Sequence, residues 1–360
     1  MSQIYPIFMK KILFIGLYFL CFCQKKEVLP TNSNDDFLRA ADLSFLPILE
    51  QENVLFFDEN NQQKELLDIL KTKGCNAVRL KLWKNPTENL GADWENVQKM
   101  LQKVRSKNLQ TWLTVHYSDT WADPSQQKTP KIWENLPFEL LKDSVGNYTE
   151  KIVKELNPDF IQIGNEINGG FLFPNGSIQT IEKFKNLLQI ACSAVRKTNP
   201  KTQIILHFAG LQASEWFFEQ LKDIDFDVIG LSYYPIWHGK NLATLESTLQ
   251  SLSKKYQKKI LIAETAYPFT LSWNDWTNNV VGSTDQILPD YAASPQGQKY
   301  FLVKIKDIAQ KTPKGIGFCY WGGELVAYRG KESKNASSWE NQALFDFENK
   351  ALPVLSVFQK

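Results

Sequence analysis

The chain has 360 residues, of which 43% are apolar and 22% are charged, and these values are typical of a folded globular protein rather than a disordered one. Its 41 Lys and Arg residues and 39 Asp and Glu residues leave a formal net charge of +2. That balance argues against a dedicated nucleic-acid-binding protein, which would carry a strong basic excess. The length suits one large catalytic domain, and the 11 tryptophans either fill a core or provide surfaces that stack on flat ligands.

The first 23 residues are predicted to be an export signal. Met9, the better start, is followed directly by two lysines and an apolar run, 12–22, that is too short to span a bilayer as a helix. The run ends in a loose bacterial lipobox with Cys23 as the residue to be lipidated, although Phe22 stands where a small residue is usual. We therefore expect an exported protein, lipid-anchored to the outer membrane on its periplasmic or cell-surface face; ordinary secretion or an uncleaved anchor is the alternative. Residues 24–36 are polar and predict a flexible tether.

Three cysteines follow the signal, at positions 75, 192 and 319. Their number is odd and they form no Cys-x-x-Cys or Cys/His pattern, so the spacing supports neither a disulfide framework nor a zinc site. Cys75 and Cys319 stand in apolar, strand-like segments and are expected to be buried packing residues.

Short β-rich segments alternate with helical patterns along the rest of the chain, and most of the strand segments are almost continuously apolar, as parallel strands buried on both faces are. The strand segments are 37–45, 76–83, 109–117, 159–168, 202–210, 227–234, 259–267 and 314–323. The helical patterns are 62–73, 93–107, 137–156, 178–198, 214–223, 242–256 and 295–311. The alternation predicts an α/β fold, a single (β/α)8 TIM barrel over residues 37–360 in which the C-terminal segment stands in for the last helix. The alternative, an open doubly wound sheet, needs a glycine-rich phosphate turn after the first strand, and the sequence has none there.

In a barrel of this type the active site lies at the carboxyl-terminal ends of the strands. Here those ends carry charged, amide and aromatic side chains together, which a merely structural barrel does not require. Eight of the 11 tryptophans lie at or beyond these ends, which favours ligand-stacking surfaces over a tryptophan-rich core. They are Trp83, Trp121, Trp133, Trp237, Trp273, Trp276, Trp321 and Trp339.

Two carboxylates at the expected strand ends stand out. Glu166 ends the fourth expected strand and Glu264 the seventh, so a rigid element delivers each to the mouth of the barrel. Strands on opposite sides would place the two groups across the mouth from each other, as glycosidases require, and retaining enzymes need a separation of about 5–5.5 Å. Either glutamate alone is more simply explained as a rim salt bridge with Arg79. Their coincidence with His116 and Tyr233 favours catalysis.

Two stretches at these strand ends are the most specific motifs of the chain, namely HYSDTWADP at 116–124 and QIGNEIN at 162–168. Four further stretches complete the pattern, at 76–86, 227–235, 264–268 and 341–347. Together they resemble family 53 of the glycoside hydrolases, the endo-β-1,4-galactanases (arabinogalactan endo-β-1,4-galactanases) of the large retaining (β/α)8 clan. The resemblance covers residues 41–359, essentially the whole mature chain.

The resemblance implies an endo-acting, retaining hydrolase that cleaves β-1,4-galactosidic linkages in galactan or in the type I arabinogalactan side chains of pectin, by double displacement. A related β-glycosidase with exo action or another β-linked glycan is the alternative within the clan. A non-catalytic glycan-binding lipoprotein is the alternative from another class, which the presence of both glutamates disfavours. The implied partner is a galactan chain, with no nucleic acid, contact with a membrane only through the lipid anchor, and a monomer as the default state.

Carried over residue by residue, the resemblance implies Glu166 as general acid/base and Glu264 as nucleophile. Asn165 should contact the sugar 2-hydroxyl, through a bond that tightens in the transition state. Arg79 and Tyr233 should hold Glu264 ionised and aimed, since a nearby cation lowers the pKa of a carboxyl group.

The remaining expected site residues orient or bind. His116 is expected to orient the catalytic pair, with a packed barrel histidine as the alternative, and Trp321 to form the floor of the subsite for the sugar that is cleaved. Asp119 and Asp123 are expected either to bind sugar hydroxyls or to cap a loop. The tryptophans expected to stack on flanking galactosyl units are Trp83, Trp121, Trp237 and Trp339.

The resemblance also raises the question of a metal ion. Several bacterial members of the family hold calcium through an acidic loop after strand seven that carries glycine and histidine. In this chain the corresponding segment, 268–276, lacks that ligand-rich spacing. We therefore expect that no cofactor is required; a structural calcium ion is left open as an alternative, although its usual loop motif is missing.

Overall fold

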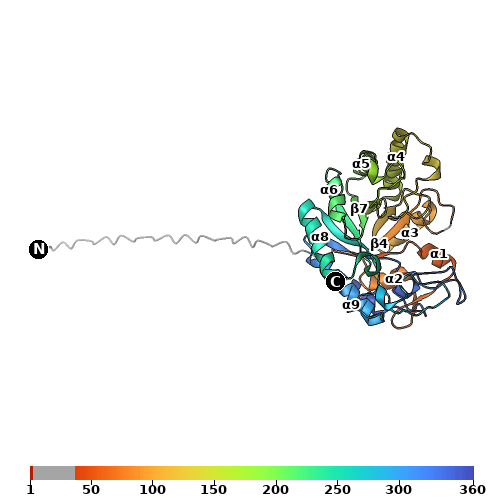
Figure 1. The fold of residues 1–360 in the computed structure, drawn as a ribbon. Helices are drawn as coiled ribbons and strands as arrows, with labels where there is room; N and C mark the ends of the chain where they lie inside the picture. The colour runs from red at the N-terminus through yellow and green to blue at the C-terminus, as the bar shows by residue number, and fades with distance from the viewer. Residues whose placement is uncertain (3–36, 89) are drawn as a thin grey trace. The chain divides into compact units, whose positions relative to one another are not determined.

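The computed structural model describes residues 1–2, 37–88 and 90–360 (Figure 1). The expected lipidation site at Cys23, the expected tether at 24–36 and nearly all of the expected export signal lie outside the described residues. No helix in the described part of the chain is both long and apolar enough to cross a membrane.

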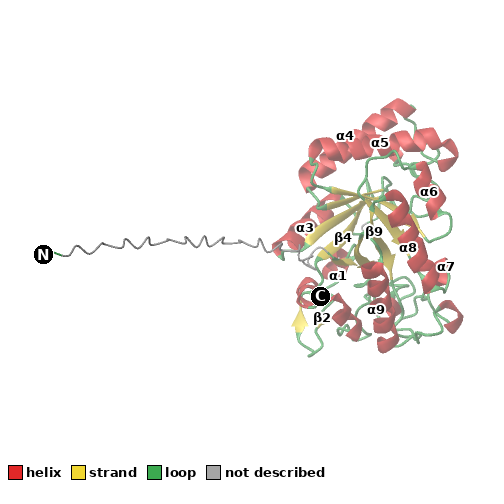
Figure 2. Ribbon diagram, turned by 90° about the vertical axis from the view of Figure 1, so that its left-hand side faces the viewer, coloured by secondary structure: helices red, strands yellow, loops and turns green. Residues whose placement is uncertain are grey.

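Eight parallel strands of the described chain close into a barrel, with the helices outside it (Figure 2). Their order around the barrel is β1-β10-β9-β8-β7-β6-β5-β4. They are β1 (Leu38–Asp42), β4 (Ala77–Leu82), β5 (Gln110–Val115), β6 (Phe160–Ile163), β7 (Gln203–Ala209), β8 (Val228–Ser232), β9 (Lys259–Thr265) and β10 (Gly315–Tyr320). Each lies inside one of the eight expected segments, so the predicted (β/α)8 barrel is confirmed and the open sheet is excluded.

All seven expected helices are present, most of them with shorter ends. They are α2 (Leu66–Thr72), α3 (Trp94–Ser106), α4 (Phe138–Leu156), α5 (Ile181–Thr198), α6 (Ser214–Gln220), α8 (Leu242–Tyr256) and α9 (Pro295–Lys311). A 3-10 turn at Pro353–Phe358 packs against α9 in place of an eighth helix, as expected of the C-terminal segment. The other 3-10 turns of the described chain are Lys131–Trp133, Ile178–Thr180, Thr284–Gln286 and Glu340–Gln342.

Four short elements were not expected from the sequence. They are the helices α1 (Leu46–Gln51) and α7 (Pro235–His238) and the two strands of a hairpin, β2 (Phe56–Phe57) and β3 (Gln63–Lys64). Each is too short to show a helical or strand periodicity. Because Gln63 and Lys64 pair in this hairpin, the helix expected at 62–73 begins only at Leu66.

The barrel interior changes from apolar to polar toward the carboxyl ends of its strands. Alternate residues of a strand point to the same face, so the residue two places after an interior side chain is also interior. Arg79, Gln162 and His207 are all buried. Each stands two residues after a member of a small buried apolar cluster, namely Ala77, Phe160 and Ile205. A polar layer is thus stacked on the apolar interior, directly beneath the mouth of the barrel.

The three cysteines of the described chain are free thiols. Cys75, Cys192 and Cys319 are all buried, and burial raises the pKa of Cys75 to about 12. The packing role that was expected of Cys75 and Cys319 is confirmed.

Candidate active site

A pocket of about 590 Å³ opens where the carboxyl ends of the strands meet. Its lining comes from the ends of β5 to β10 and from the segments that follow them. Eight of the expected site residues line it, and they are Trp121, Asp123, Asn165, Glu166, Trp237, Glu264, Trp321 and Trp339. The mouth of the barrel is therefore the place where the expected catalytic and aromatic residues converge.

An irregularity in β9 aims Glu264 into this pocket. Leu231 of β8 pairs with Ile262 of β9, but the next residue, Ser232, pairs with Glu264, so that Ala263 is an extra residue in β9. Bulges of this kind re-aim side chains and are frequent beside active sites. Ala263 packs in the apolar interior, and the bulge lets the very next side chain also point inward.

Glu166 is presented by a tight turn just beyond β6. The strand ends at Ile163, earlier than the expected 168, because Gly164 has a φ of +76° and Glu166 has a φ of +47°. A Cβ at position 164 would lie 2.4 Å from the side chain of Ile167, so glycine is required there. A glutamate in the left-handed region costs about 1–3 kcal/mol, a strain that proteins keep mainly at functional sites.

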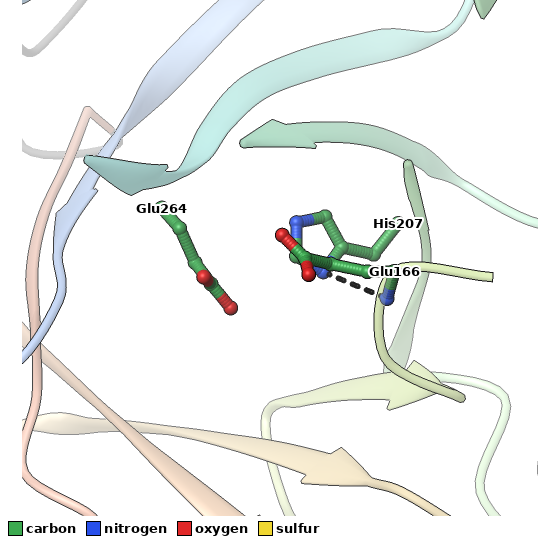
Figure 3. Close-up of side chains that lie close together, drawn as sticks. All are labelled: Glu166, His207 and Glu264. Atoms are coloured by element: carbon green, nitrogen blue, oxygen red, sulfur yellow. Dashed lines mark hydrogen bonds between the residues drawn. The ribbon is translucent and has the colours of Figure 1, made fainter. Parts of the chain in front are cut away.

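The two carboxylates converge across the pocket (Figure 3). One oxygen of Glu166, one oxygen of Glu264 and a ring nitrogen of His207 all lie within 4.8 Å of one another. The predicted approach of the two glutamates, which are 98 positions apart in the sequence, is thus confirmed. Their proximity fits the close spacing of retaining glycosidases and is shorter than the roughly 6.5–9.5 Å of inverting ones.

Glu264 is held by a cation and a hydroxyl. Arg79 Nη2 lies 2.7 Å from Glu264 Oε1, while Arg79 Nη1 lies 2.8 Å from Asp42 Oδ2. The Tyr234 hydroxyl donates to Glu264 Oε2 at 3.0 Å. Burial raises the pKa of Glu264, whereas the charge of Arg79 and the Tyr234 hydrogen bond oppose that shift. The buried guanidinium is thus the main support for the ionised form of this carboxyl.

Glu166 has no cation in contact with its carboxyl group within the described chain. Its one hydrogen-bond donor there is the Ser232 hydroxyl, 2.5 Å from Oε1. Burial, and after it the charge of Glu264, raises the pKa of Glu166 to about 8. At neutral pH the pair therefore consists of a protonated Glu166 and an ionised Glu264, because only the latter touches Arg79.

Asn165 lies between these groups with its amide orientation fixed. Its Oδ1 accepts from Arg79 Nη2 at 2.9 Å, and its Nδ2 donates to the carbonyl of Ala122, also at 2.9 Å. The second N–H of Nδ2 is available to the pocket that Asn165 lines.

Four tryptophans form a continuous wall of the pocket. Trp321 meets Trp339 edge to face at 4.7 Å, and Trp339 stacks on Trp237 at 6.2 Å with 29° between the ring planes. Trp121 packs against Trp321 at 6.2 Å, and the buried Lys81 ammonium lies 4.7 Å from the centre of the Trp121 ring. Flat apolar faces beside two carboxylates suit a sugar, which has both apolar ring faces and hydroxyl groups.

The chain matches the model of glycosyl hydrolase family 53 over residues 38–358. It is 33% identical to the arabinogalactan endo-beta-1,4-galactanase of Cellvibrio japonicus, with 91% of each chain covered. The chain belongs to glycosyl hydrolase family 53. Its identity to the endo-beta-1,4-galactanase of Bacillus subtilis is 32%, covering 91% of this chain and 86% of that one. The solved family 53 catalytic domain of Ignisphaera aggregans has 38% identity and a TM-score of 0.85, over 90% of this chain and 96% of that one.

One expectation for this family 53 site is wrong by a single position. Tyr233 was expected beside Glu264, but its hydroxyl donates to the Gly239 carbonyl at 2.8 Å. Its neighbour Tyr234 contacts Glu264 instead. The reason is the strand alternation, since Ser232 at the end of β8 faces inward and Tyr233 must therefore face outward.

Two further expectations are corrected by burial. His116 does not orient the pair, because its Nδ1 accepts from Trp83 Nε1 at 3.1 Å and from the Ala122 N–H at 3.2 Å. It is the packed barrel histidine of the alternative interpretation, and the histidine beside Glu166 and Glu264 is His207. Trp83 is only 1% exposed, so its ring is not available to stack on a sugar.

The two aspartates of the family 53 motif at 116–124 both shape loops. Asp119 accepts from the backbone N–H groups of Asn85 and Lys131, each at 2.9 Å. It therefore caps loops, which is one of the two roles expected for it. Asp123 accepts from the Ser125 N–H at 2.7 Å and also lines the pocket.

The ion pair and hydrogen bonds made by Glu264 and His207 disfavour a metal ion between Glu166 and Glu264. Glu166, His207 and Glu264 are the one group of described residues close enough to share an ion. However, Glu264 already forms an ion pair with Arg79. Both ring nitrogens of His207 lie within hydrogen-bond distance of other groups, Nε2 of the Ser232 hydroxyl and Nδ1 of the Gln162 amide. A guanidinium in contact with Glu264 would repel a cation bound there.

Two of the buried carboxyl groups in the loops after β9 and β10, those of Asp275 and Glu340, lie near each other. Glu340 Oε1 accepts from the backbone N–H groups of Asn274 and Asp275, at 2.7 and 3.4 Å. Asp275 Oδ2 and Glu340 Oε2 have no hydrogen-bond partner among the described residues. Burial, and to a lesser degree the neighbouring Asp275, raises the pKa of Glu340. These two oxygens fit the hard ligands that calcium prefers, although calcium usually takes six to eight oxygens.

Sequence reasoning did not single out four residues that this family 53 site uses. Gln162, His207 and Ser232 connect to Glu166, and Tyr234 to Glu264. A strict count of the strand alternation would have placed Gln162 and His207 inside the barrel, two residues beyond apolar interior positions. The bulge in β9 gives no comparable signal in the sequence.

Proposed function

We propose that this family 53 hydrolase is an endo-β-1,4-galactanase that cleaves galactan, or the type I arabinogalactan side chains of pectin, with net retention. The single observation that carries the proposal is the convergence of Glu166 and Glu264 within 4.8 Å in an aromatic-walled pocket. The galactosidic substrate is supported by the two relatives named as galactanases, each over about nine-tenths of this chain.

In the first step the ionised Glu264 attacks the anomeric carbon and forms an ester bond to it, while the bond from that carbon to the glycosidic oxygen breaks. Protonated Glu166 gives its proton to the leaving oxygen, so the outgoing sugar departs with a free hydroxyl. Arg79 and the Tyr234 hydroxyl hold the attacking carboxylate in line. The free N–H of Asn165 would bind the sugar 2-hydroxyl, where a bond strengthens in the transition state.

In the second step Glu166, now a carboxylate, takes a proton from water, and the resulting hydroxide attacks the anomeric carbon. The ester bond to Glu264 breaks, and Glu264 leaves as a carboxylate that Arg79 again stabilises. Both starting protonation states are restored, and two inversions give net retention.

The wall of tryptophans supports endo rather than exo action. Trp237 is 55% exposed at the rim and stacks on Trp339, so the aromatic surface extends from the pocket toward solvent. A chain could thus continue beyond the cleaved unit on flat faces. Early release of mixed oligosaccharides from galactan is expected, whereas a single product size from the start would favour an exo-acting relative.

Substrate preference is tested with purified polysaccharides. Release of reducing ends is expected to be far faster from β-1,4-galactan than from β-1,4-glucan or β-1,4-mannan at equal mass concentration. All three are β-1,4-linked and differ in the configuration of the sugar, which sets the direction of the linkage, so the comparison tests recognition of the galactosyl unit. Equal or faster hydrolysis of glucan or mannan would assign the enzyme to a different glycan.

The proposed chemistry needs no metal ion, because one glutamate supplies the nucleophile and the other the proton. Treatment with EDTA followed by dialysis is expected to leave kcat on galactan unchanged. Any effect of added calcium is expected in the Tm, since Asp275 and Glu340 belong to loops outside the reacting pair. Loss of turnover that a divalent cation restores would contradict this.

For localisation we keep the proposal of an exported lipoprotein, anchored through Cys23 to the outer membrane. Its support is the basic and apolar segment followed by the lipobox-like sequence before a polar stretch. We also propose a monomer, since one chain supplies the whole barrel and both carboxylates. Metabolic labelling with a fatty acid in the wild type and in Cys23→Ala tests the anchor, and light scattering of the soluble domain tests the mass.

A further inference from the structure

A chain of hydrogen bonds runs from the barrel interior to the carboxyl group of Glu166. Gln162 Nε2 lies 3.0 Å from Nδ1 of His207, and His207 Nε2 lies 2.8 Å from the Ser232 oxygen. The Ser232 hydroxyl is in turn 2.5 Å from Glu166 Oε1. His207 and Ser232 are fully buried, so solvent does not compete for these bonds.

The direction of donation along these hydrogen bonds is set by N–H groups that can only donate. The backbone N–H of Glu166 points at His207 Nδ1 at 3.4 Å, as the dashed line in Figure 3 shows. The amide of Gln162 is fixed as well, because its Nε2 also donates to the Gly164 carbonyl at 3.0 Å while its Oε1 faces Arg79 at 3.4 Å. Asn165 Oδ1 also lies 3.2 Å from Nδ1, but it already accepts from Arg79 Nη2 and from Gln162 Nε2. Nδ1 of His207 therefore accepts from the Glu166 N–H, and the proton of the neutral ring is on Nε2.

The remaining bonds follow from this tautomer. With its proton on Nε2, His207 donates to the Ser232 oxygen, and the Ser232 hydroxyl must then donate onward to Glu166 Oε1. Oε1 is thereby occupied as an acceptor. No hydrogen bond of the described chain reaches Glu166 Oε2, and Glu166 lines the pocket.

We propose that His207 and Ser232 are positioning residues that confine the acidic proton of Glu166 to Oε2, the oxygen left free for the glycosidic oxygen. The inference rests on the proposed function, in which Glu166 is the general acid. Without these hydrogen bonds the proton could lie on either oxygen of Glu166, and a proton on Oε1 would not face the glycosidic oxygen. The same hydrogen bonds keep the carboxyl group of Glu166 from rotating between protonation of the leaving group and deprotonation of water.

The effect on pH dependence has a definite sign. The Ser232 hydroxyl lowers the pKa of Glu166, because it donates to the charged form, so its removal should raise that pKa further. Burial, together with the charge of Arg79, lowers the pKa of His207 well below its usual value, so the ring stays neutral. The titratable or charged groups that face Glu166 or His207 from the surrounding elements are Glu264, Arg79, Asp123, Tyr234, His116 and His238.

The test compares Ser232→Ala with wild type on two substrates, of which one needs an acid to protonate its leaving group and the other does not. On β-1,4-galactan, whose leaving group must be protonated, kcat/KM is expected to fall roughly 10–100-fold, the effect of losing one hydrogen bond to a charged group. On 2,4-dinitrophenyl β-1,4-galactobioside, whose phenolate leaves without a proton, it is expected to change less than about threefold. The alkaline limb of the galactan pH profile should move to higher pH.

Two variants separate positioning from a general effect on the fold. Ser253→Ala removes another buried hydroxyl, which donates to the Pro313 carbonyl far along the chain, and should leave both rates and the pH profile unchanged. Ser232→Thr keeps the hydroxyl and should restore most of the galactan rate.

The outcomes distinguish the inference from the proposed function. An equal loss on both substrates in Ser232→Ala, or an unmoved alkaline limb, would overturn the positioning role while wild-type galactanase activity stands. Absence of galactan hydrolysis in the wild type would instead refute the proposed function itself.

Discussion

Glu264→Gln is expected to lower kcat/KM on β-1,4-galactan by on the order of 10⁴-fold or more, because an amide cannot form the glycosyl ester. The amide keeps the shape of the side chain, and Arg79 keeps Asp42 as a partner at 2.8 Å, so the variant should still fold. Initial rates of reducing-end release, together with the Tm of the purified variant, measure both effects. The matched control is Glu324→Gln, which removes a buried carboxylate that accepts from the Phe45 N–H and leaves the reacting pair intact.

Small anions identify the role of Glu264 as well as its importance. In Glu264→Ala, azide is expected to restore turnover of 2,4-dinitrophenyl galactobioside and to yield the α-galactosyl azide, since it attacks with one inversion from the vacated side. In Glu166→Ala the covalent intermediate still forms with this leaving group, and azide should yield the β-galactosyl azide. Exchange of these two anomers between the variants would reverse the assigned roles. Wild-type turnover in Glu264→Gln would remove Glu264 from the mechanism.

Glu166→Gln is the second large effect, with an expected fall of about 10²–10⁴-fold in kcat/KM on galactan, the range typical of a lost general acid. With the dinitrophenyl substrate the first step needs no proton, so the intermediate should form rapidly and then accumulate. A burst of dinitrophenolate followed by slow turnover is the expected signature. Equal losses on both substrates would point to a structural role for Glu166.

The pH profile offers a further check on Glu166. Because its pKa is raised to about 8, the acid form is present at neutral pH and is lost as the pH rises through that value. Wild-type kcat/KM on galactan should therefore fall on the alkaline side near pH 8, and this limb should vanish in Glu166→Gln. On the acid side activity should fall where Glu264 becomes protonated, above the usual range of a glutamate, because burial raises its pKa as well.

The barrel and the meeting of Glu166 and Glu264 at its mouth could be predicted because their signals in the sequence are local or repetitive. Buried parallel strands are nearly continuous apolar runs in the sequence. Eight such runs that alternate with helices are compatible with few folds other than a (β/α)8 barrel. Glu166 and Glu264 stand at the ends of such runs, where a barrel gathers its active site. Strand order predicted that they meet at the mouth of the barrel, whereas the bulge in β9 and the turn after β6 set their approach to within 4.8 Å.

The predictions for individual site residues were wrong where the role of a residue depends on one position in a strand or on one contact. Tyr233 and Tyr234 are neighbours of one type, and only the inward direction of Ser232 determines which of them meets Glu264. His116 belongs to a distinctive motif, yet its ring is engaged by Trp83. His207 lies in a plain apolar strand without any motif, and its importance appears only when its hydrogen bonds are known.

The most direct measurement is the proton NMR spectrum of the sugar released in the first minutes of galactan hydrolysis, before mutarotation mixes the anomers. A nucleophile and a proton donor this close should deliver the β-anomer first, with the α-anomer growing in only as mutarotation proceeds. Initial appearance of the α-anomer would mean that water attacks directly, and the covalent role assigned to Glu264 would then be wrong.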